Sequence, residues 1–149
     1  MTEVAEHRDM RARVERLEAL LEKLPQVDCP VRHHFAPGVY MREMTVPAGV
    51  RAVGAVHKTE HLTIVAGHCL LTTDDRVREF DGYDTFLSRP GAKRAIVAIE
   101  KTIVTTVHVT NETDLETLCE QLTESTSAEL LGGSRNRQLL AQQTLEVEN

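Results

Sequence analysis

The sequence contains very few aromatic residues and no tryptophan. Phenylalanine and tyrosine make up only 3% of its 149 residues, so a hydrophobic core has to be built mainly from Val, Leu, Ile and Ala. No apolar run approaches the roughly 18 residues that a membrane-spanning helix needs, and no secretory signal peptide is recognisable. The three cysteines, at positions 29, 69 and 119, form no C-x-x-C pair. These absences favour a reduced, cytoplasmic location.

Basic residues are also fewer than acidic residues. Lys and Arg number 17 against 23 Asp and Glu, which gives a formal net charge of −6. Such a balance argues against nonspecific binding to nucleic acid or to anionic membranes. The sequence has no glycine-rich phosphate loop and no nucleophile–base–orienter arrangement. We therefore expect neither nucleic acid nor membrane as a partner.

The length predicts one domain with appendages. Residues 1–25 are expected to form an N-terminal helix for oligomerisation or packing, and residues 26–38 a linker. Residues 39–124 are expected to form a β-barrel with a covering helix, and residues 125–149 a flexible tail rich in Ser, Thr, Gln and Gly.

The N-terminal helix is expected over residues 2–24, because its apolar residues repeat in steps of four and three and Pro25 ends the pattern. The apolar positions are Met10, Val14, Leu17, Leu21 and Leu24. A helix this short needs a partner for its apolar stripe. Two arrangements are open: self-association as a coiled-coil-like dimer or trimer, or folding back onto the chain's own barrel.

From Val39 to Thr110 the signals are those of β-structure. Short segments of β-branched residues alternate with turn residues such as Pro47-Ala-Gly49, Asp81-Gly82 and Pro90-Gly91. The pattern predicts a small antiparallel β-barrel. The stretch Thr113-Asp-Leu-Glu116 is a capping box that starts a short amphipathic helix, which we expect to cover one end of the barrel.

The most informative stretch is His57-x-x-Glu60-His61, which is followed by a β-rich segment containing Gly67. Imidazole and carboxylate are common ligands of Zn, Fe, Mn or Ni, so the cluster is a candidate site for a divalent transition metal. On a helix the same spacing would be an inverted zinc-protease motif, but glycines and β-branched residues surround it. On a strand, parity places His57 and His61 on one face and Glu60 on the other.

The closing strand supplies a third histidine. In Thr105-Thr106-Val107-His108-Val109, alternation places His108 and Thr106 on one face and the two valines on the other. If that face points inward, His108 can join His57 and either His61 or Glu60 in a three-ligand metal site with an open position.

Lys93 and Arg94 follow the predicted turn at Pro90-Gly91. A guanidinium does not ligate metals but binds carboxylate or phosphate in a bidentate manner. We expect these two cations to contribute to ligand binding, either by holding an anion beside a metal or by a pairing of Arg94 with Glu60 in a metal-free barrel. The alternative is an exposed pair of turn residues.

Several of these segments resemble the cupin superfamily. Glu60, six intervening residues and Gly67 are similar to half of the first cupin motif, and the stretch from Pro90 to Arg94 is similar to the core of the second. Ala55 and Arg94 stand where that family carries histidine ligands. The run from residue 33 to residue 122 further resembles small stand-alone cupin proteins of phages and prophages, in its H-H-F-x-x-G-V-Y, H-K-T-E-H, S-x-P-G-x-K-R and T-T-x-H segments. The resemblance implies a cupin-type jelly-roll barrel.

Three functional hypotheses remain from the sequence. The first is a non-enzymatic protein that binds a metal or a small anionic ligand within a homo-oligomer. The second is a metal-dependent enzyme of isomerase or dioxygenase type that uses His57, Glu60, His61 and His108. The third is a virion or phage-accessory protein in which the barrel is a scaffold for contacts with other phage proteins. A phage protein would act in the host cytoplasm or in the virion.

Overall fold

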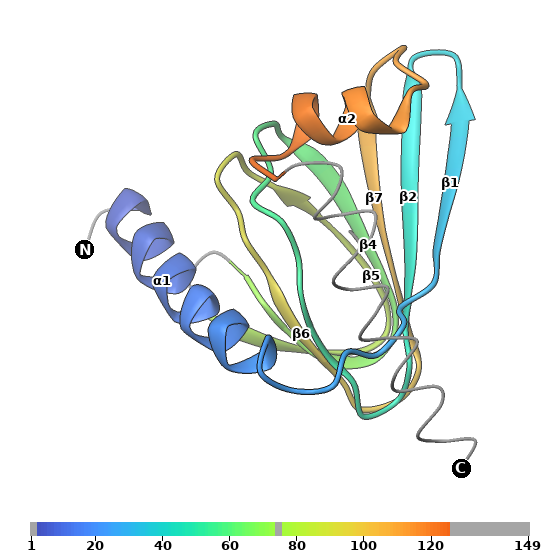
Figure 1. The fold of residues 1–149 in the computed structure, drawn as a ribbon. Helices are drawn as coiled ribbons and strands as arrows, with labels where there is room; N and C mark the ends of the chain where they lie inside the picture. The colour runs from blue at the N-terminus through green and yellow to red at the C-terminus, as the bar shows by residue number, and fades with distance from the viewer. Residues whose placement is uncertain (1–2, 74–75, 126–149) are drawn as a thin grey trace.

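The computed structural model describes residues 3–73 and 76–125, and shows a curled antiparallel sheet with a helix along its side and another across one end (Figure 1). The elements in chain order are α1 (Glu3–Leu21), β1 (Val31–Ala36), β2 (Val39–Val46), β3 (Arg51–Val53), β4 (His61–Thr72), β5 (Val77–Ser88), β6 (Ala95–Ala98), β7 (Thr102–Val109) and α2 (Leu115–Leu122). Within these residues, neither helix combines the length and the apolar character needed to cross a bilayer.

The sheet has seven strands, and all of its pairings are antiparallel. Its order is β1-β2-β7-β4-β6-β3, and β5 pairs with the other side of β4. Strand β4 is therefore the centre of the fold. It pairs with β7 along residues 62–66 and with β6 along residues 69–71. The sheet curls at this change of neighbour, and its concave face carries the core.

Gly67 lies where β4 changes partner from β7 to β6. Its φ is +143°, and a Cβ there would lie 2.6 Å from the carbonyl oxygen of Lys101 and 2.7 Å from the Cα of Thr102. Only a residue without a side chain allows the start of β7 to pass so close to β4. The glycine thus sets the bend of the central strand.

The main core is aliphatic, as the composition requires, and it lies on the concave face. Its buried members are Val46, Val65, Cys69, Leu71, Phe80, Ile96 and Ala98. They come from β2, β4, β5 and β6, so the core covers one half of the concave face. Helix α2 covers the other half.

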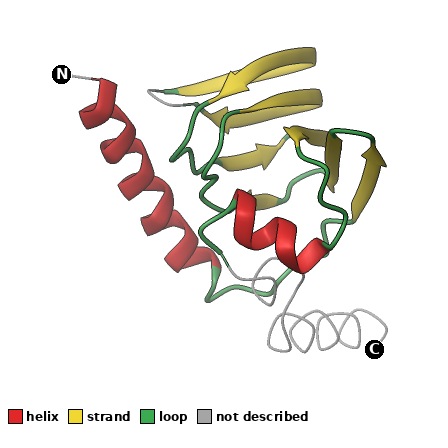
Figure 2. Cartoon of the chain, turned by 90° about the horizontal axis from the view of Figure 1, so that it is seen from above, coloured by secondary structure: helices red, strands yellow, loops and turns green. Residues whose placement is uncertain are grey.

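The covering helix is confirmed as α2, which lies across one end of the sheet when the molecule is seen from above (Figure 2). Leu118 and Leu122 are buried against Tyr40 of β2. The N-cap is Asp114 rather than Thr113, because the Asp114 carboxylate accepts hydrogen bonds from both the backbone N–H and the hydroxyl of Thr117. The predicted capping box is therefore wrong by one residue, although the predicted helix is present.

Helix α1 packs on its own chain. Met10 and Val14 are buried against Ala95 of β6, with Leu17 beside them. The fold-back arrangement is thus observed for this part of the apolar stripe, whereas Leu20 and Leu24 are exposed. Self-association stays a prediction.

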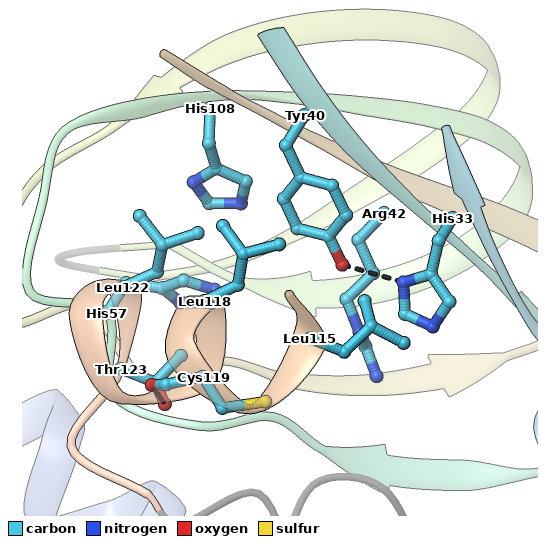
Figure 3. Close-up of a pocket in the computed structure, with 10 residues that line it drawn as sticks. All are labelled: His33, Tyr40, Arg42, His57, His108, Leu115, Leu118, Cys119, Leu122 and Thr123. Carbon is cyan, nitrogen blue, oxygen red and sulfur yellow. Dashed lines mark hydrogen bonds between the residues drawn. The ribbon is translucent and has the colours of Figure 1, made fainter. Parts of the chain in front are cut away.

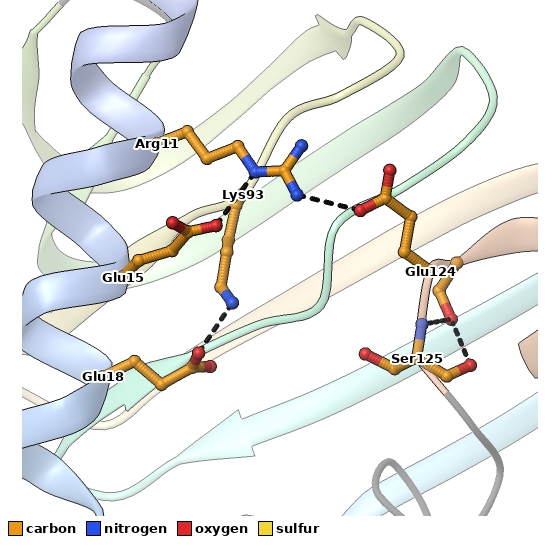
Figure 4. A network of polar contacts seen from close by, with 7 residues as sticks. Arg11, Glu15, Glu18, Lys93, Glu124 and Ser125 are labelled. Atoms are coloured by element: carbon orange, nitrogen blue, oxygen red, sulfur yellow. Dashed lines mark hydrogen bonds and ion pairs between the residues drawn. The ribbon is translucent and has the colours of Figure 1, made fainter.

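Two ion pairs connect one face of α1 to the rest of the molecule (Figure 4). Arg11 contacts Glu124, just beyond α2, at 2.9 Å, and Glu18 contacts Lys93 at 2.7 Å. The Lys93 side chain is only 11% exposed, so this pair is better shielded from solvent than most surface pairs. The helix is held by charge as well as by apolar contacts.

Three details differ from the expected layout. The second half of the linker expected over residues 26–38 forms strand β1, which pairs with β2 through the Pro37-Gly38 turn. The turn expected at Asp81-Gly82 is absent, because Gly82 pairs directly with Gly67 and β5 runs on unbroken. The sheet is a curled half-barrel rather than a closed barrel, since β1, β3 and β5 each pair on one side only among the described strands. From residue 126 onward, the expected tail lies outside the described residues.

We expect Gly67→Ala to destabilise the protein much more than Gly82→Ala. Both glycines have positive φ, so both substitutions carry backbone strain, but only the Cβ at position 67 meets neighbouring backbone; nothing lies within 4 Å at position 82. The additional loss should be about 1–3 kcal/mol, as for overpacking elsewhere. Urea unfolding of the two variants measures the difference. Equal losses would show that the close approach of β7 is not needed.

Candidate functional site

The candidate site is built from the β1–β2–β7 end of the sheet. Register places Tyr40 opposite His108 and Arg42 opposite Thr106, and it places His33 opposite Arg42 on the other side. Alternation therefore directs the side chains of Tyr40, Arg42, His108 and His33 to the concave face. His108 is 3% exposed while Val109 is 92% exposed, which confirms the predicted parity of the closing strand.

A cavity of about 40 Å³ lies between this end of the sheet and α2 (Figure 3). It is lined by His33, Tyr40, Arg42, His57, His108, Leu115, Leu118, Cys119, Leu122 and Thr123. A single water needs roughly 10–15 Å³ of such space, so the cavity accommodates about three or four water-sized groups.

The lining has two chemically different sides. The sheet and the loop before β4 contribute a phenol, a guanidinium and three imidazoles, whereas α2 contributes mainly leucines. On the sheet side, the Tyr40 hydroxyl and Nδ1 of His33 are hydrogen-bonded at 2.7 Å. Burial raises the pKa of Tyr40 and lowers that of His33, so both groups are neutral near pH 7.

Arg42 is the charged group of the cavity. Burial lowers the pKa of Arg42, and the groups that partly offset this effect are Tyr40, Cys119 and Cys29, none of which is an acid with a low pKa. Within the described residues Arg42 makes no ion pair or hydrogen bond, and none of the lining residues is acidic. A guanidinium remains protonated at any physiological pH. As far as the described residues go, the positive charge of Arg42 in the cavity is therefore uncompensated.

Next to the cavity, three imidazoles are in ring contact. The ring centroids of His57 and His61 are 4.3 Å apart, those of His61 and His108 are 4.7 Å apart, and those of His57 and His108 are 5.8 Å apart. These residues come from the loop before β4, the start of β4 and the end of β7. They are three of the four residues that the sequence predicts as metal ligands, and the fourth is Glu60.

The hydrogen bonds of these rings leave some nitrogens without a partner. Nδ1 of His61 donates to the carbonyl oxygen of Thr59 at 3.0 Å, so its Nε2 carries the lone pair. Nε2 of His108 is 2.9 Å from the Thr106 hydroxyl, and its buried Nδ1 has no hydrogen-bond partner. The rings face each other with interplanar angles of 17–40°. As placed, no three His, Cys, Asp or Glu side chains of the described chain form a metal-holding group.

Burial holds the three imidazoles in the neutral form. Desolvation, reinforced by the other two histidines and by Arg42 and Arg94, lowers the pKa of His57 to about 3. Desolvation, with His61 and Arg42, lowers the pKa of His108 to about 4. The pKa of His61 is also lowered by burial. Near pH 7 the cluster offers lone pairs and N–H donors but no positive charge.

The remaining predicted site residues lie elsewhere. Glu60, which the sequence predicts as a metal and ligand-binding residue, is exposed. Lys93 is engaged with Glu18 of α1. Arg94 donates to the carbonyl oxygen of Thr72 and to the Ser88 hydroxyl, and none of these three predicted residues lines the cavity.

Three residues of the cavity were not singled out from the sequence as its components, namely His33, Tyr40 and Arg42. A signal for two of them was present. In the strand Val39–Val46, alternation places Tyr40 and Arg42 on the same face as Met44 and Val46, and polar residues on an otherwise apolar face mark a site. His33 belongs to a histidine pair that invites a metal interpretation, but it lies in the predicted linker before a turn, and a structural or solvated role was expected for it.

We expect stability to fall as the pH decreases from about 6.5 toward 4 in metal-free protein. His57 and His108 have folded-state pKa values of about 3 and about 4, below the unfolded value of 6.5. In this window the unfolded chain binds more protons, so the stability present above pH 6.5 is lost on acidification. At pH 5 each histidine accounts for at most about 2 kcal/mol.

His108→Gln should flatten this pH dependence in urea unfolding with EDTA present. His68→Gln is the matched control, because Glu79 raises the pKa of His68 and its contribution has the opposite sign. A wild-type slope in the His108 variant would show that its imidazole is not held neutral by the fold.

Neither a protein-family profile nor a curated protein matches this sequence. Among solved structures, the chain is similar to a cupin superfamily protein from Desulfitobacterium hafniense, with 14% identity, a TM-score of 0.44 and coverage of 60% of this chain and 86% of that one. It is also similar to a cupin domain from Bordetella pertussis, with 10% identity, a TM-score of 0.46 and coverage of 58% and 98%.

A third neighbour is a cupin-2 domain protein from Shewanella frigidimarina, with 11% identity, a TM-score of 0.44 and coverage of 63% of this chain and 92% of that one. These structural neighbours are cupin-domain proteins. A likeness with TM-scores of 0.44–0.46 and identities of 10–14% does not extend to ligand or chemistry.

Proposed function

We propose that this chain is a binding protein that holds a small anionic ligand in the cavity beneath α2, with Arg42 neutralising the ligand's charge. The observation that carries the proposal is the side chain of Arg42, which lines the cavity, whereas no acidic side chain does so among residues 3–73 and 76–125. A guanidinium binds carboxylate or phosphate oxygens in a bidentate manner.

Energetics supports an anion as the missing partner. A charge moved out of water costs free energy unless it is paired and hydrogen-bonded. Arg42 meets neither condition among the described residues. An anion in the cavity would offset this cost and would gain additional hydrogen bonds from the neutral imidazoles and the phenol of the wall.

The state of the imidazoles favours binding over catalysis. A general base works best when its pKa lies near the operating pH. His57 and His108 have pKa values of about 3 and about 4, which makes them weak bases near neutral pH. They are suited to positioning a ligand through neutral hydrogen bonds.

We expect Arg42→Gln to abolish stabilisation of the protein by small anions. Thermal unfolding is followed in sodium acetate, sulfate or phosphate and compared with sodium chloride at equal ionic strength. A ligand at a hundred times its Kd adds about 2.7 kcal/mol to the wild type, and this gain should be lost in the variant. Arg32→Gln is the matched control, because Arg32 is 72% exposed and lies one residue from His33.

In chloride alone, Arg42→Gln should be as stable as the wild type or more stable, because it removes an unpaired charge from a half-buried position. Stabilisation by an anion that is undiminished in Arg42→Gln, or the absence of any stabilising anion, would refute the proposal.

A divalent transition metal is the second candidate ligand. The observation in its favour is the buried Nδ1 of His108, which has no hydrogen-bond partner in the described part of the chain and lies beside two further neutral imidazoles. Neutral imidazole is the form that ligates metals. Binding would require the rings of His57, His61 and His108 to turn so that their nitrogens converge. This candidate is the one on which an isomerase- or dioxygenase-type activity would depend.

The metal candidate predicts one equivalent of Zn²⁺ per untagged chain, measured by elemental analysis after equilibrium dialysis. His57→Ala should lose the metal, whereas Glu60→Ala should keep it, because Glu60 is exposed while the imidazoles are in mutual contact. Metal content that is the same in His57→Ala, or absent from the wild type, would remove this candidate.

We propose on the sequence resemblance alone that the protein is of the phage and prophage cupin type and works in the host cytoplasm or the virion. Self-association is part of the same proposal. Leu20 and Leu24, which are 61% and 54% exposed, are the part of the apolar stripe on α1 and just beyond it that is free for a second copy. The scaffold alternative, in which other phage proteins bind the ends of the molecule, rests on the same resemblance.

A further inference from the structure

We infer that the anion is a short monocarboxylate of about the size of acetate or propionate, with its carboxylate on Arg42 and its alkyl end against the leucines of α2. This inference rests on the proposed function and narrows it from anions in general to one chemical class. Three properties of the cavity lead to it: its volume, its two-sided wall and its single charge.

The volume limits the part of the ligand that lies inside the cavity to a few non-hydrogen atoms. The cavity measures about 40 Å³, and one water-sized group needs roughly 10–15 Å³. The two oxygens of a carboxylate and one or two alkyl carbons make up three or four such groups. Sugars and nucleotides are too large for this space.

The two-sided wall selects a carboxylate over a tetrahedral oxyanion. The charged and hydrogen-bonding groups of the sheet side include Arg42, Tyr40 and His108, while Leu115, Leu118 and Leu122 form the helix side (Figure 3). Phosphate and sulfate carry oxygens in all directions, and an oxygen turned toward the leucines would lose its hydration without gaining a donor. A monocarboxylate has both oxygens at one end and an apolar group at the other.

The two polar groups on the helix side do not change this assignment. The Thr123 hydroxyl already donates to the carbonyl oxygen of Cys119 at 2.7 Å. Burial raises the pKa of the Cys119 thiol, which keeps it protonated and only a weak donor. The helix side therefore offers little to a second set of oxygens.

The charge of the wall selects a monoanion. Among the described residues of the lining, Arg42 is the single Lys or Arg, and none is Asp or Glu. One guanidinium compensates one carboxylate. A dicarboxylate would place a second negative charge among leucines without a partner.

The test is a binding series on the full chain at pH 7, by calorimetry and by competition, with formate, acetate, propionate, hexanoate, sulfate and phosphate as probes. We expect affinity to rise roughly fourfold for each added methylene from formate to propionate, as for apolar burial in general. Hexanoate should bind more weakly than propionate because it exceeds the volume. Sulfate and phosphate should not displace propionate.

Leu115→Asn tests the apolar contact, because Leu115 lines the cavity and is only half-buried. The variant should lose the gain from formate to propionate, and an unchanged far-UV circular dichroism spectrum shows that it is folded. Leu24→Asn is the matched control on the exposed segment after α1 and should behave as the wild type.

Each result decides the inference. Affinity that depends on Arg42 and rises from formate to propionate supports it. Sulfate or phosphate binding that depends on Arg42, without carboxylate competition, overturns the inference and leaves the proposed function standing. Absence of binding by every probe overturns both.

Discussion

The close passage of β7 across Gly67 is the contact on which the arrangement of the sheet depends. The backbone of Lys101 and Thr102 occupies the space that the side chain of any other residue at position 67 would need. This lets one long strand serve two neighbours in succession, β7 along its first half and β6 along its second. A sheet with such a branch in its pairing curls, and the curl provides the concave face.

The concave face is divided into two regions by chemistry. Toward β6 it is filled by aliphatic side chains, which form a core with few aromatics. Toward β1 the same alternation places a guanidinium, a phenol and imidazoles inward, where side chains alone do not fill the space. The short helix α2 closes this polar region with leucines. Core and cavity are thus neighbouring parts of one surface.

Much of this arrangement could be predicted from the sequence because alternation along strands is a strong constraint. Alternation along the closing strand placed His108 on the face where it is buried, and the apolar spacing after Asp114 predicted α2. Glu60, which was predicted as a ligand in the pocket, is exposed. The pairing of strands that are far apart in the sequence was harder to predict. Asp81-Gly82 has the composition of a turn, but its glycine instead stands opposite Gly67 in an unbroken strand. Because of the prolines around β1, a linker was predicted there instead of a strand. The contribution of β1 to the sheet side of the cavity was therefore missed.

A protein that holds an unpaired cation in a partly desolvated place is less stable empty than filled. The stabilisation by a bound ligand is a sizeable fraction of the free energy of unfolding of a small domain. Cellular proteases act on the unfolded fraction, so a change of this order alters how long a chain survives. Under the proposed function, Arg42 would therefore couple the lifetime of the protein to the supply of the anion, and the amount of protein in the cell would follow the amount of that small molecule.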